Sequence, residues 1–218
     1  MDPKSQRIRA VHNMKQNLIL DAALTIIAKD GYHAARLEDI ADEAGFSKAS
    51  LYHYFPDREA LVLQLVLREQ NILIEKCGAI VDRHSDAVTA LREIISLFFS
   101  TMHKHSQFHK SFGDIIESRI SNMATIATKH SELFQSVVAG REEISGFILQ
   151  VIELGLEQQQ FTTPLDSKTI STYVQSIIQG IFMQTCMEGY EQFDVEEETD
   201  KLLIFLTPLL APKSGETI

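Results

Sequence analysis

The segment from Gly31 to Leu61 constrains the fold of this 218-residue chain more than any other part of the sequence. It reads GYHAARLEDIADEAGFSKASLYHYFPDREAL. Apolar residues recur at intervals of three and four from Leu37 to Ala44, which predicts a short helix with one apolar face. Gly45 then follows as a turn residue, because glycine has no Cβ and adopts positive φ without strain. The segment therefore predicts two short helices that meet at a tight turn.

The second of these helices is expected to begin after Ser47, whose hydroxyl is a good N-cap. Leu51, with Tyr54 or Phe55, then faces inward, and Pro56 ends the helix. The outward face keeps polar, methyl and aromatic groups that suit base edges, thymine methyls and phosphates in a major groove. A helix-turn-helix is also a common way to pack two helices, so the pattern alone leaves a structural role open. If the segment binds DNA, the expected contacts are Arg36, Ser47, Lys48, Ala49, Ser50, Tyr52, His53, Tyr54 and Arg58.

This segment, with the apolar residues Ile19 to Ala23 before it, closely resembles the DNA-binding module of the tetracycline-repressor (TetR) family of bacterial transcription regulators. The matching pieces stand in one register: Ile19, Leu20, Ala22 and Ala23; Gly31-Tyr32; Ile40-Ala41; Ala44-Gly45-Phe46-Ser47; Leu51-Tyr52-His53-Tyr54-Phe55; and Arg58-Glu59-Ala60-Leu61. The resemblance implies an all-α fold of about nine helices, with a three-helix DNA-binding head at residues 1–58 and an effector-binding and dimerisation body at residues 59–218. The resemblance further implies that the chain is not an enzyme. It implies instead a repressor that binds a palindromic operator as a homodimer and is released by a small effector.

Three positions depart from the family pattern. Ala35-Arg36 stands where the family carries a Thr or Ser pair, which leaves the first short helix without its usual N-cap; Arg36 is then an alternative phosphate ligand. Ala49 replaces a usual glycine, which places a methyl group at the groove, and Arg58 replaces a usual lysine. These changes bear on which operator is bound.

The charge distribution favours DNA contact at the N-terminal end. The whole chain has a net charge of −10, but residues 1–58 hold eight basic and eight acidic side chains, so all the excess acid lies beyond them. The first twenty residues carry a net charge of +3. We expect a flexible basic arm there that adds phosphate or minor-groove contacts, with a merely disordered tail as the alternative.

Beyond the head, apolar residues at helical spacing predict helices over residues 57 to about 82, 86–103, 108–120, 132–159, 167–188 and 196–210. Ile72 and Val88 are among the side chains expected on their apolar faces. Methionine and phenylalanine line adaptable apolar sites, although the same stripes are also typical of plain core. For a small, largely apolar effector the candidates are Phe98, Met102, Phe112, Ile116, Met123, Phe147, Val151 and Met183.

The last two predicted helices carry more apolar surface than a small body needs. The resemblance implies that they form the dimer contact, and intramolecular core is the alternative. The candidate interface residues are Tyr173, Ile177, Gly180, Ile181, Leu202, Phe205, Leu206 and Leu209.

Other features exclude several classes of protein. The sequence has no apolar stretch long enough for a membrane span, and its N-terminus has no apolar core of the kind a signal peptide carries, which favours a cytoplasmic protein without a membrane partner. Neither a cofactor nor a metal is expected, since the histidines His103, His105 and His109 stand beside lysines and are interpreted as solvated loop residues. Two alternatives remain open: a DNA-binding dimer without an effector, and a helical metal-dependent enzyme that uses this histidine cluster.

Overall fold

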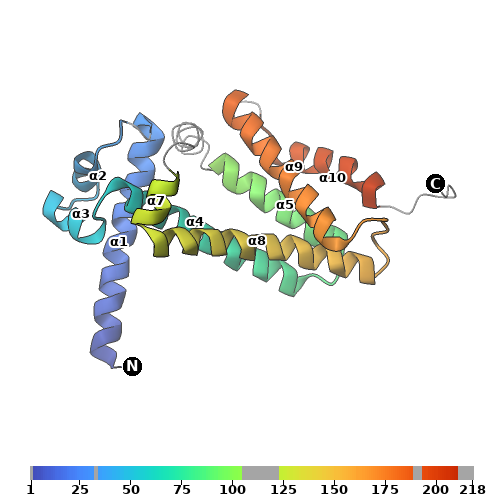
Figure 1. Ribbon diagram of the computed structural model, residues 1–218, viewed down its shortest axis with the longest axis horizontal. Helices are drawn as coiled ribbons and strands as arrows, with labels where there is room; N and C mark the ends of the chain where they lie inside the picture. Colours follow the sequence, from blue (N-terminus) through green and yellow to red (C-terminus); the bar gives the residue numbers. More distant parts are fainter. Residues whose placement is uncertain (1, 32–33, 105–122, 189–192, 211–218) are drawn as a thin grey trace. The chain divides into compact units, whose positions relative to one another are not determined.

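The structure is a computed structural model that describes residues 2–31, 34–104, 123–188 and 193–210 (Figure 1). Within these ranges the chain forms nine helices and no strand, as the sequence predicted. The helices are α1 (Pro3–Asp30), α2 (Leu37–Glu43), α3 (Lys48–Tyr54), α4 (Arg58–Arg83), α5 (Ala87–Lys104), α7 (Met123–Lys129), α8 (Ser131–Glu157), α9 (Ser167–Glu188) and α10 (Val195–Leu210). The helix predicted over residues 108–120 lies outside the described residues.

The chain divides into two compact units. The first comprises Met1–Arg68 and Gln107–Val137, and the second comprises Glu69–Ser106 and Val138–Ile218. Helices α4 and α8 each contribute residues to both units. None of the described helices has an apolar stretch that could cross a membrane.

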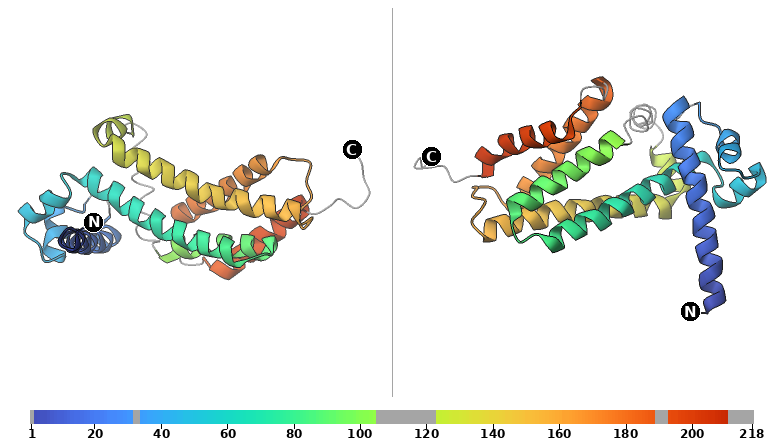
Figure 2. Two further views of the ribbon diagram at one scale, coloured as in Figure 1. Left: turned by 90° about the horizontal axis from the view of Figure 1, so that it is seen from below. Right: turned by 180° about the vertical axis from the view of Figure 1, so that it is seen from behind.

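The core of the first unit is built by the second half of α1, by α2 and α3, and by the start of α4 (Figure 2). Its largest fully buried side chains are Ile19, Ile27, Ile40, Leu51, Phe55, Leu61 and Leu65. These residues recur at helical spacing within each element, so each short helix presents one apolar face to the same centre. Burial against the longer α1 and α4 stabilises α2 and α3, which are too short to be stable alone.

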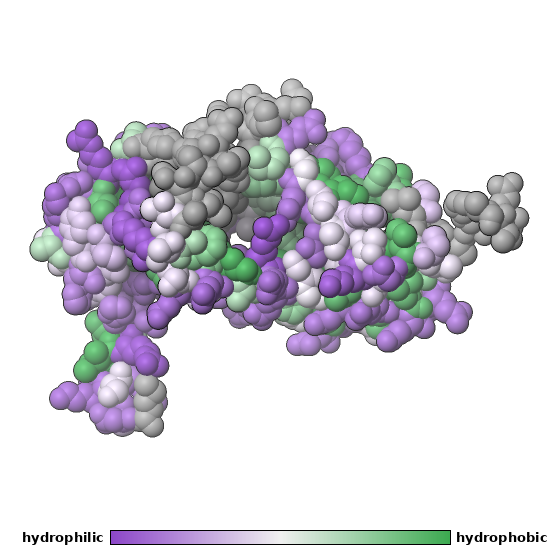
Figure 3. Space-filling view, viewed as in Figure 1, coloured by the Kyte–Doolittle hydropathy of each residue, from purple (hydrophilic) through white to green (hydrophobic). Residues whose placement is uncertain are grey.

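Helix α1 extends far beyond that core. It begins at Pro3, a residue well suited to the first turn of a helix, and its first buried side chain is Ile19. The flexible arm expected from the sequence is therefore replaced by about four helical turns, because this stretch is rich in good helix formers. Figure 3 shows apolar patches among hydrophilic surface on this part of α1, where the large exposed apolar residues are Ile8, Val11, Met14 and Leu18.

The second unit has α5 at its centre, packed against α9 and α10. Its buried core includes Ile94, Ile95, Phe99, Ile148, Ile152, Val174 and Leu202. Two side chains expected on apolar faces are instead exposed: Ile72 by 43% and Val88 by 48%. Ile72 lies off the stripe of α4 that carries Cys77 and Ile80, and Val88 lies off the stripe of α5 that carries Ala87 and Leu91.

Candidate nucleic-acid interface

The turn between α2 and α3 is built as the sequence predicted. Gly45 has φ +71°, and a Cβ built there meets no atom within 4 Å, so backbone conformation rather than space requires glycine. The Phe46 N–H donates to the Ala41 carbonyl at 2.8 Å, and the Gly45 N–H donates to the Asp42 carbonyl at 3.1 Å. These bonds close the end of α2 and set the direction in which α3 begins.

Helix α3 is capped and anchored by its own residues. The Ser50 N–H donates to the Ser47 hydroxyl oxygen at 3.2 Å, which confirms the predicted N-cap. Leu51 and Phe55 are fully buried on the inner side. Tyr54 is half-buried; its ring centroid lies 4.8 Å from that of His12 in α1. Helix α3 is therefore fixed at its N-terminal end by the Ser47 cap and at its C-terminal end by the buried Phe55, and its outer face remains accessible.

Most of the predicted DNA contacts lie on that outer face. Lys48, Ala49, Tyr52 and His53 are exposed, and Ser50 is half-buried. Ser47 is also exposed, at the N-terminus of α3. These positions bring a cation, a methyl group, hydroxyls and two amphipathic rings together, which is the mixture that base edges and phosphates accept.

Lys48 lies beside Glu38, a contact that the sequence did not predict. Its ammonium forms an ion pair with Glu38 of α2 and lies 5.8 Å from the centroid of the Tyr52 ring. The hydrogen bond from Lys48 lowers the pKa of Glu38, and the same bond raises the pKa of Lys48. Both groups are exposed, so water and salt screen the pair. Glu38 therefore neutralises part of the positive charge that Lys48 presents on the outer face of α3.

Arg36 and Arg58 lie at the N-terminal ends of α2 and α4, the helices before and after α3. Arg36 is exposed at the N-cap position of α2, and no side chain caps that helix. Glu38 and Asp39 in the first turn still oppose the helix dipole favourably. Arg58 is half-buried in the first turn of α4. The structure thus confirms that α2 lacks the side-chain cap, as the sequence indicated.

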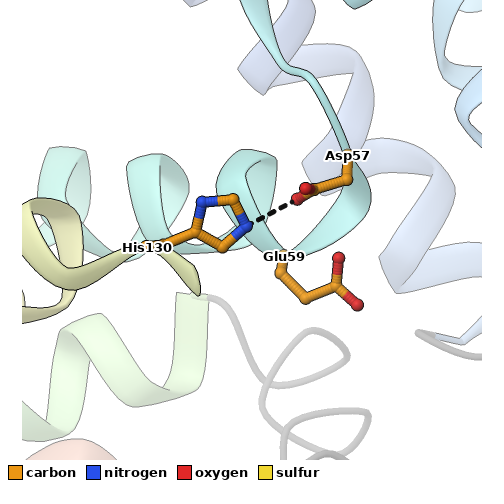
Figure 4. Close-up of side chains that lie close together, drawn as sticks. All are labelled: Asp57, Glu59 and His130. Atoms are coloured by element: carbon orange, nitrogen blue, oxygen red, sulfur yellow. Dashed lines mark ion pairs between the residues drawn. The ribbon is translucent and has the colours of Figure 1, made fainter. Parts of the chain in front are cut away.

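A charged cluster surrounds the start of α4, directly after α3. Asp57 caps α4 by accepting the Ala60 N–H at 2.8 Å. Its second oxygen, Oδ2, lies 2.9 Å from Lys129 Nζ, and its Oδ1 lies 3.0 Å from His130 Nε2 (Figure 4). Lys129 Nζ also lies 3.6 Å from Glu59 Oε2. The sequence indicated the cap but not the other partners, which come from the junction of α7 and α8 some 70 residues away.

The surroundings of Asp57 have opposing effects on its pKa. Burial raises it, but the Ala60 N–H, Lys129 and His130 outweigh burial, and the net pKa lies below the ordinary value of 3.8. A carboxyl with a lower pKa in the folded state than in the unfolded state stabilises the fold above its unfolded pKa. That stabilisation is lost as the pH falls through the pKa that Asp57 has in the folded state.

Substitutions at Asp57 should separate the stability contributed by its capping hydrogen bond from the stability contributed by its negative charge. Asp57→Ala should lower the free energy of unfolding by about 1 kcal/mol at pH 7, because the cap is lost. Asp57→Asn keeps a capping oxygen but no carboxylate, so its stability should fall less than that of wild type between pH 5 and pH 3. Urea unfolding across this range measures both effects. Equal acid sensitivity of wild type and Asp57→Asn would contradict the assignment.

The residues predicted for an effector site belong mainly to the second unit. Met102 and Val151 are buried in its core, Phe98 and Phe147 pack partly buried against it, and Met183 is half-buried. Phe112, Ile116 and the side chain of Met123 lie outside the described residues. An open groove of about 390 Å³ lies elsewhere, between α4 and α5, lined by Lys76, Ala79, Ile80, Arg83, Glu93, Ser96, Leu97 and Ser100. None of the predicted effector residues that the structure describes lines it.

The residues predicted for a dimer contact fall into two groups. Tyr173 and Phe205 are 57% and 58% exposed, and Gly180 has no atom within 4 Å of a Cβ built on it. Leu202 and Leu206, by contrast, are buried in the core of their own unit, against which Ile177 and Ile181 pack half-buried. The side chain of Leu209 lies outside the described residues. Ile204, which is 72% exposed, was not among the predicted residues.

A three-helix head whose capped third helix carries polar and aromatic groups on its outer face defines a helix-turn-helix DNA-binding protein. Residues 19–65 match the family model described as "Bacterial regulatory proteins, tetR family". The head of the chain, over residues 19–65, therefore belongs to this family of transcriptional regulators.

Known relatives extend the similarity beyond the head. The fatty acid metabolism regulator protein of Bacillus subtilis (strain 168) is 26% identical over 162 residues, which cover 72% of this chain and 81% of that protein. The HTH-type transcriptional regulator RutR of Escherichia coli (strain K12) is 34% identical over 107 residues, 49% of this chain and 50% of RutR. The crystal structure of FadR from Bacillus subtilis in complex with stearoyl-CoA is similar in fold, with a TM-score of 0.71 at 22% identity over 87% of this chain and 96% of FadR.

Proposed function

We propose that this chain is an operator-binding repressor that acts as a homodimer and is released by a small effector with a largely apolar part. The observation that carries the proposal is the outer face of α3, where Lys48, Tyr52 and His53 are exposed on a helix anchored by Leu51 and Phe55. Selection of bound duplexes from random-sequence DNA tests it. A dimer should enrich a near-palindrome whose half-sites lie about 34 to 36 Å apart, in successive major grooves. Recovery of no common sequence would count against operator binding.

The proposed dimer contact uses α9 and α10. Tyr173 of α9 and Phe205 of α10 expose large apolar or aromatic surface, and the exposed Gly180 permits a close approach of helices. Leu202 and Leu206 contribute indirectly, because they fix α10 to the core from its inner side. Sedimentation at micromolar concentration should report twice the chain mass of 24.6 kDa. A monomer under these conditions would contradict the proposal.

We further propose that the effector is a long-chain acyl thioester. The support is the name of the Bacillus subtilis relative, a fatty acid metabolism regulator, and the stearoyl-CoA bound to the FadR of similar fold. The apolar side chains of Phe98, Phe147 and Met183 in the second unit are chemically suited to an acyl chain.

Stearoyl-CoA should stabilise the protein, whereas coenzyme A alone should not. A ligand at 100 times its dissociation constant adds about 2.7 kcal/mol to the free energy of unfolding, so Tm should rise by roughly 5 °C or more. Stearate serves as the second control, because it separates recognition of the chain from recognition of the thioester. If neither stearoyl-CoA nor stearate changes Tm, while operator binding persists, the chain is a DNA-binding dimer without an acyl effector.

Release from the operator requires that effector and DNA prefer different states of the dimer. The coupling is reciprocal: the effector should lower operator affinity by the same factor by which operator DNA lowers effector affinity. Measuring both factors by fluorescence anisotropy distinguishes this linkage from simple competition at one surface, in which no ternary complex forms.

The N-terminal half of α1 should add phosphate contacts to those of α3. Lys4, Arg7, Arg9 and Lys15 are exposed there, and the contact between His12 and Tyr54 places this helix alongside the end of α3. Replacing all four cations by glutamine should weaken operator binding and make the slope of log K against log[salt] shallower by roughly 0.9 for each phosphate that is no longer neutralised. The matched control is Lys168→Gln, an exposed cation of α9 in the second unit. An unchanged slope in the quadruple variant would remove α1 from the interface.

A further inference from the structure

We propose that Asp57, Glu59 and His130 form a binding site for a divalent transition-metal ion such as Zn²⁺, for which the ammonium of Lys129 competes. The three donors come from two separate segments, the first turn of α4 with its cap and the junction between α7 and α8 (Figure 4). One ligand atom from each residue lies within 4.8 Å of the other two. All three residues belong to the first compact unit.

The imidazole of His130 carries the inference. Its side chain is only 10% exposed, and its Nε2 is directed at Asp57. Although Nε2 lies 3.0 Å from Asp57 Oδ1, the buried nitrogen makes no contact with the geometry of a hydrogen bond. The two atoms thus lie close together without a well-placed shared proton. A metal ion resolves this arrangement, because it accepts a lone pair from both the nitrogen and the oxygen.

The donor set selects a class of ion. One imidazole and two carboxylates suit Zn²⁺ and its neighbours Co²⁺ and Ni²⁺, whereas Mg²⁺ and Ca²⁺ prefer oxygen donors alone. Bonds to Zn²⁺ measure about 2.0 to 2.2 Å, so the Glu59 carboxylate must move closer to Asp57 and His130, whose donor atoms are already 3.0 Å apart. Glu59 is the ligand with room to move, since its side chain is 35% exposed. Water would complete the coordination.

Lys129 is the competing cation. Its Nζ lies 2.9 Å from Asp57 Oδ2 and 3.6 Å from Glu59 Oε2, so it neutralises both carboxylates. The Lys129 side chain is 52% exposed and can turn into solvent when an ion enters. Asp57 keeps its hydrogen bond from the Ala60 N–H in either case. Binding therefore exchanges one cation for another.

Titration of the whole 218-residue chain with Zn²⁺ by calorimetry, and with Co²⁺ by absorption spectroscopy, tests the site. We expect one ion per chain, removed by EDTA. His130→Gln and Glu59→Gln should each weaken binding by roughly tenfold or more, as removal of a ligand requires. Lys129→Met should instead strengthen binding, by roughly fivefold, because a competing charge about 4 Å away is removed. An ion-pair cluster without metal affinity would show no such opposite effects.

The control variant is His105→Gln with His109→Gln, which removes two of the three clustered histidines His103, His105 and His109. It should leave binding unchanged. The proposal is overturned if the wild-type protein binds no Zn²⁺ at micromolar concentrations, if His130→Gln binds like wild type, or if the control variant loses the ion. Glu59→Gln, at a partly exposed position, keeps the test decisive should His130→Gln fail to fold. None of these measurements involves DNA, so their outcome is independent of operator binding.

Discussion

Lys48→Met should weaken operator binding by about tenfold to a hundredfold, which is the usual effect of removing one well-placed base or phosphate contact. Lys48 stands in the first turn of α3, where a recognition helix enters the major groove. Because its side chain is 60% exposed, the substitution should leave Tm nearly unchanged. Fluorescence anisotropy with the selected operator at a fixed salt concentration measures the effect.

Glu38→Gln provides the matched control, with an effect of opposite sign. It removes the carboxylate that pairs with Lys48 and leaves a side chain of the same shape. Operator binding should become tighter or stay equal, because Lys48 is released to phosphate and a repelling charge is removed. If Lys48→Met binds the operator like wild type, Lys48 makes no significant contact with the operator. If Glu38→Gln weakens binding, the ion pair positions Lys48 rather than competing for it.

The local features of the head could be predicted because each has a short-range cause. Gly45 permits a backbone conformation that other residues avoid, and the Ser47 hydroxyl accepts the N–H of Ser50, three residues further on. Asp57 caps α4 in the same way. Signals of this kind depend on neighbours within four residues, so a single sequence contains them.

The charged contacts of the head could not be predicted in this way. Glu38 and Lys48 sit on different helices, and their pairing depends on the angle at which α2 and α3 cross. His130 reaches Asp57 only because the chain returns after some 70 residues. Periodicity shows that a helix has a buried face but does not show what covers that face. For this reason the sequence could not assign Leu202 to the core of its own unit and Phe205 to the exposed surface.

Gly155→Ala should lower the free energy of unfolding by about 1 to 3 kcal/mol, despite the better helix propensity of alanine, because it overpacks the core of the second unit. A Cβ on Gly155 would lie 2.0 Å from Phe161 Cδ2, 2.3 Å from Cε2 and 2.8 Å from Cγ. Since even Cγ is too close, the whole ring must move. Phe161 has little freedom to do so, because it is 6% exposed and its N–H donates to the Gly155 carbonyl at 2.9 Å.

Gly146→Ala, in the same helix α8, isolates the packing effect. A Cβ there meets no atom within 4 Å, so the substitution should raise stability by about 0.5 to 1 kcal/mol through helix propensity alone. The two variants make the same chemical change nine residues apart and should shift Tm in opposite directions, by roughly 2 to 4 °C per kcal/mol. Equal shifts would mean that Phe161 does not close over Gly155 in solution. A stability loss confined to Gly155→Ala would show that the ring of Phe161 packs directly on Gly155 in solution.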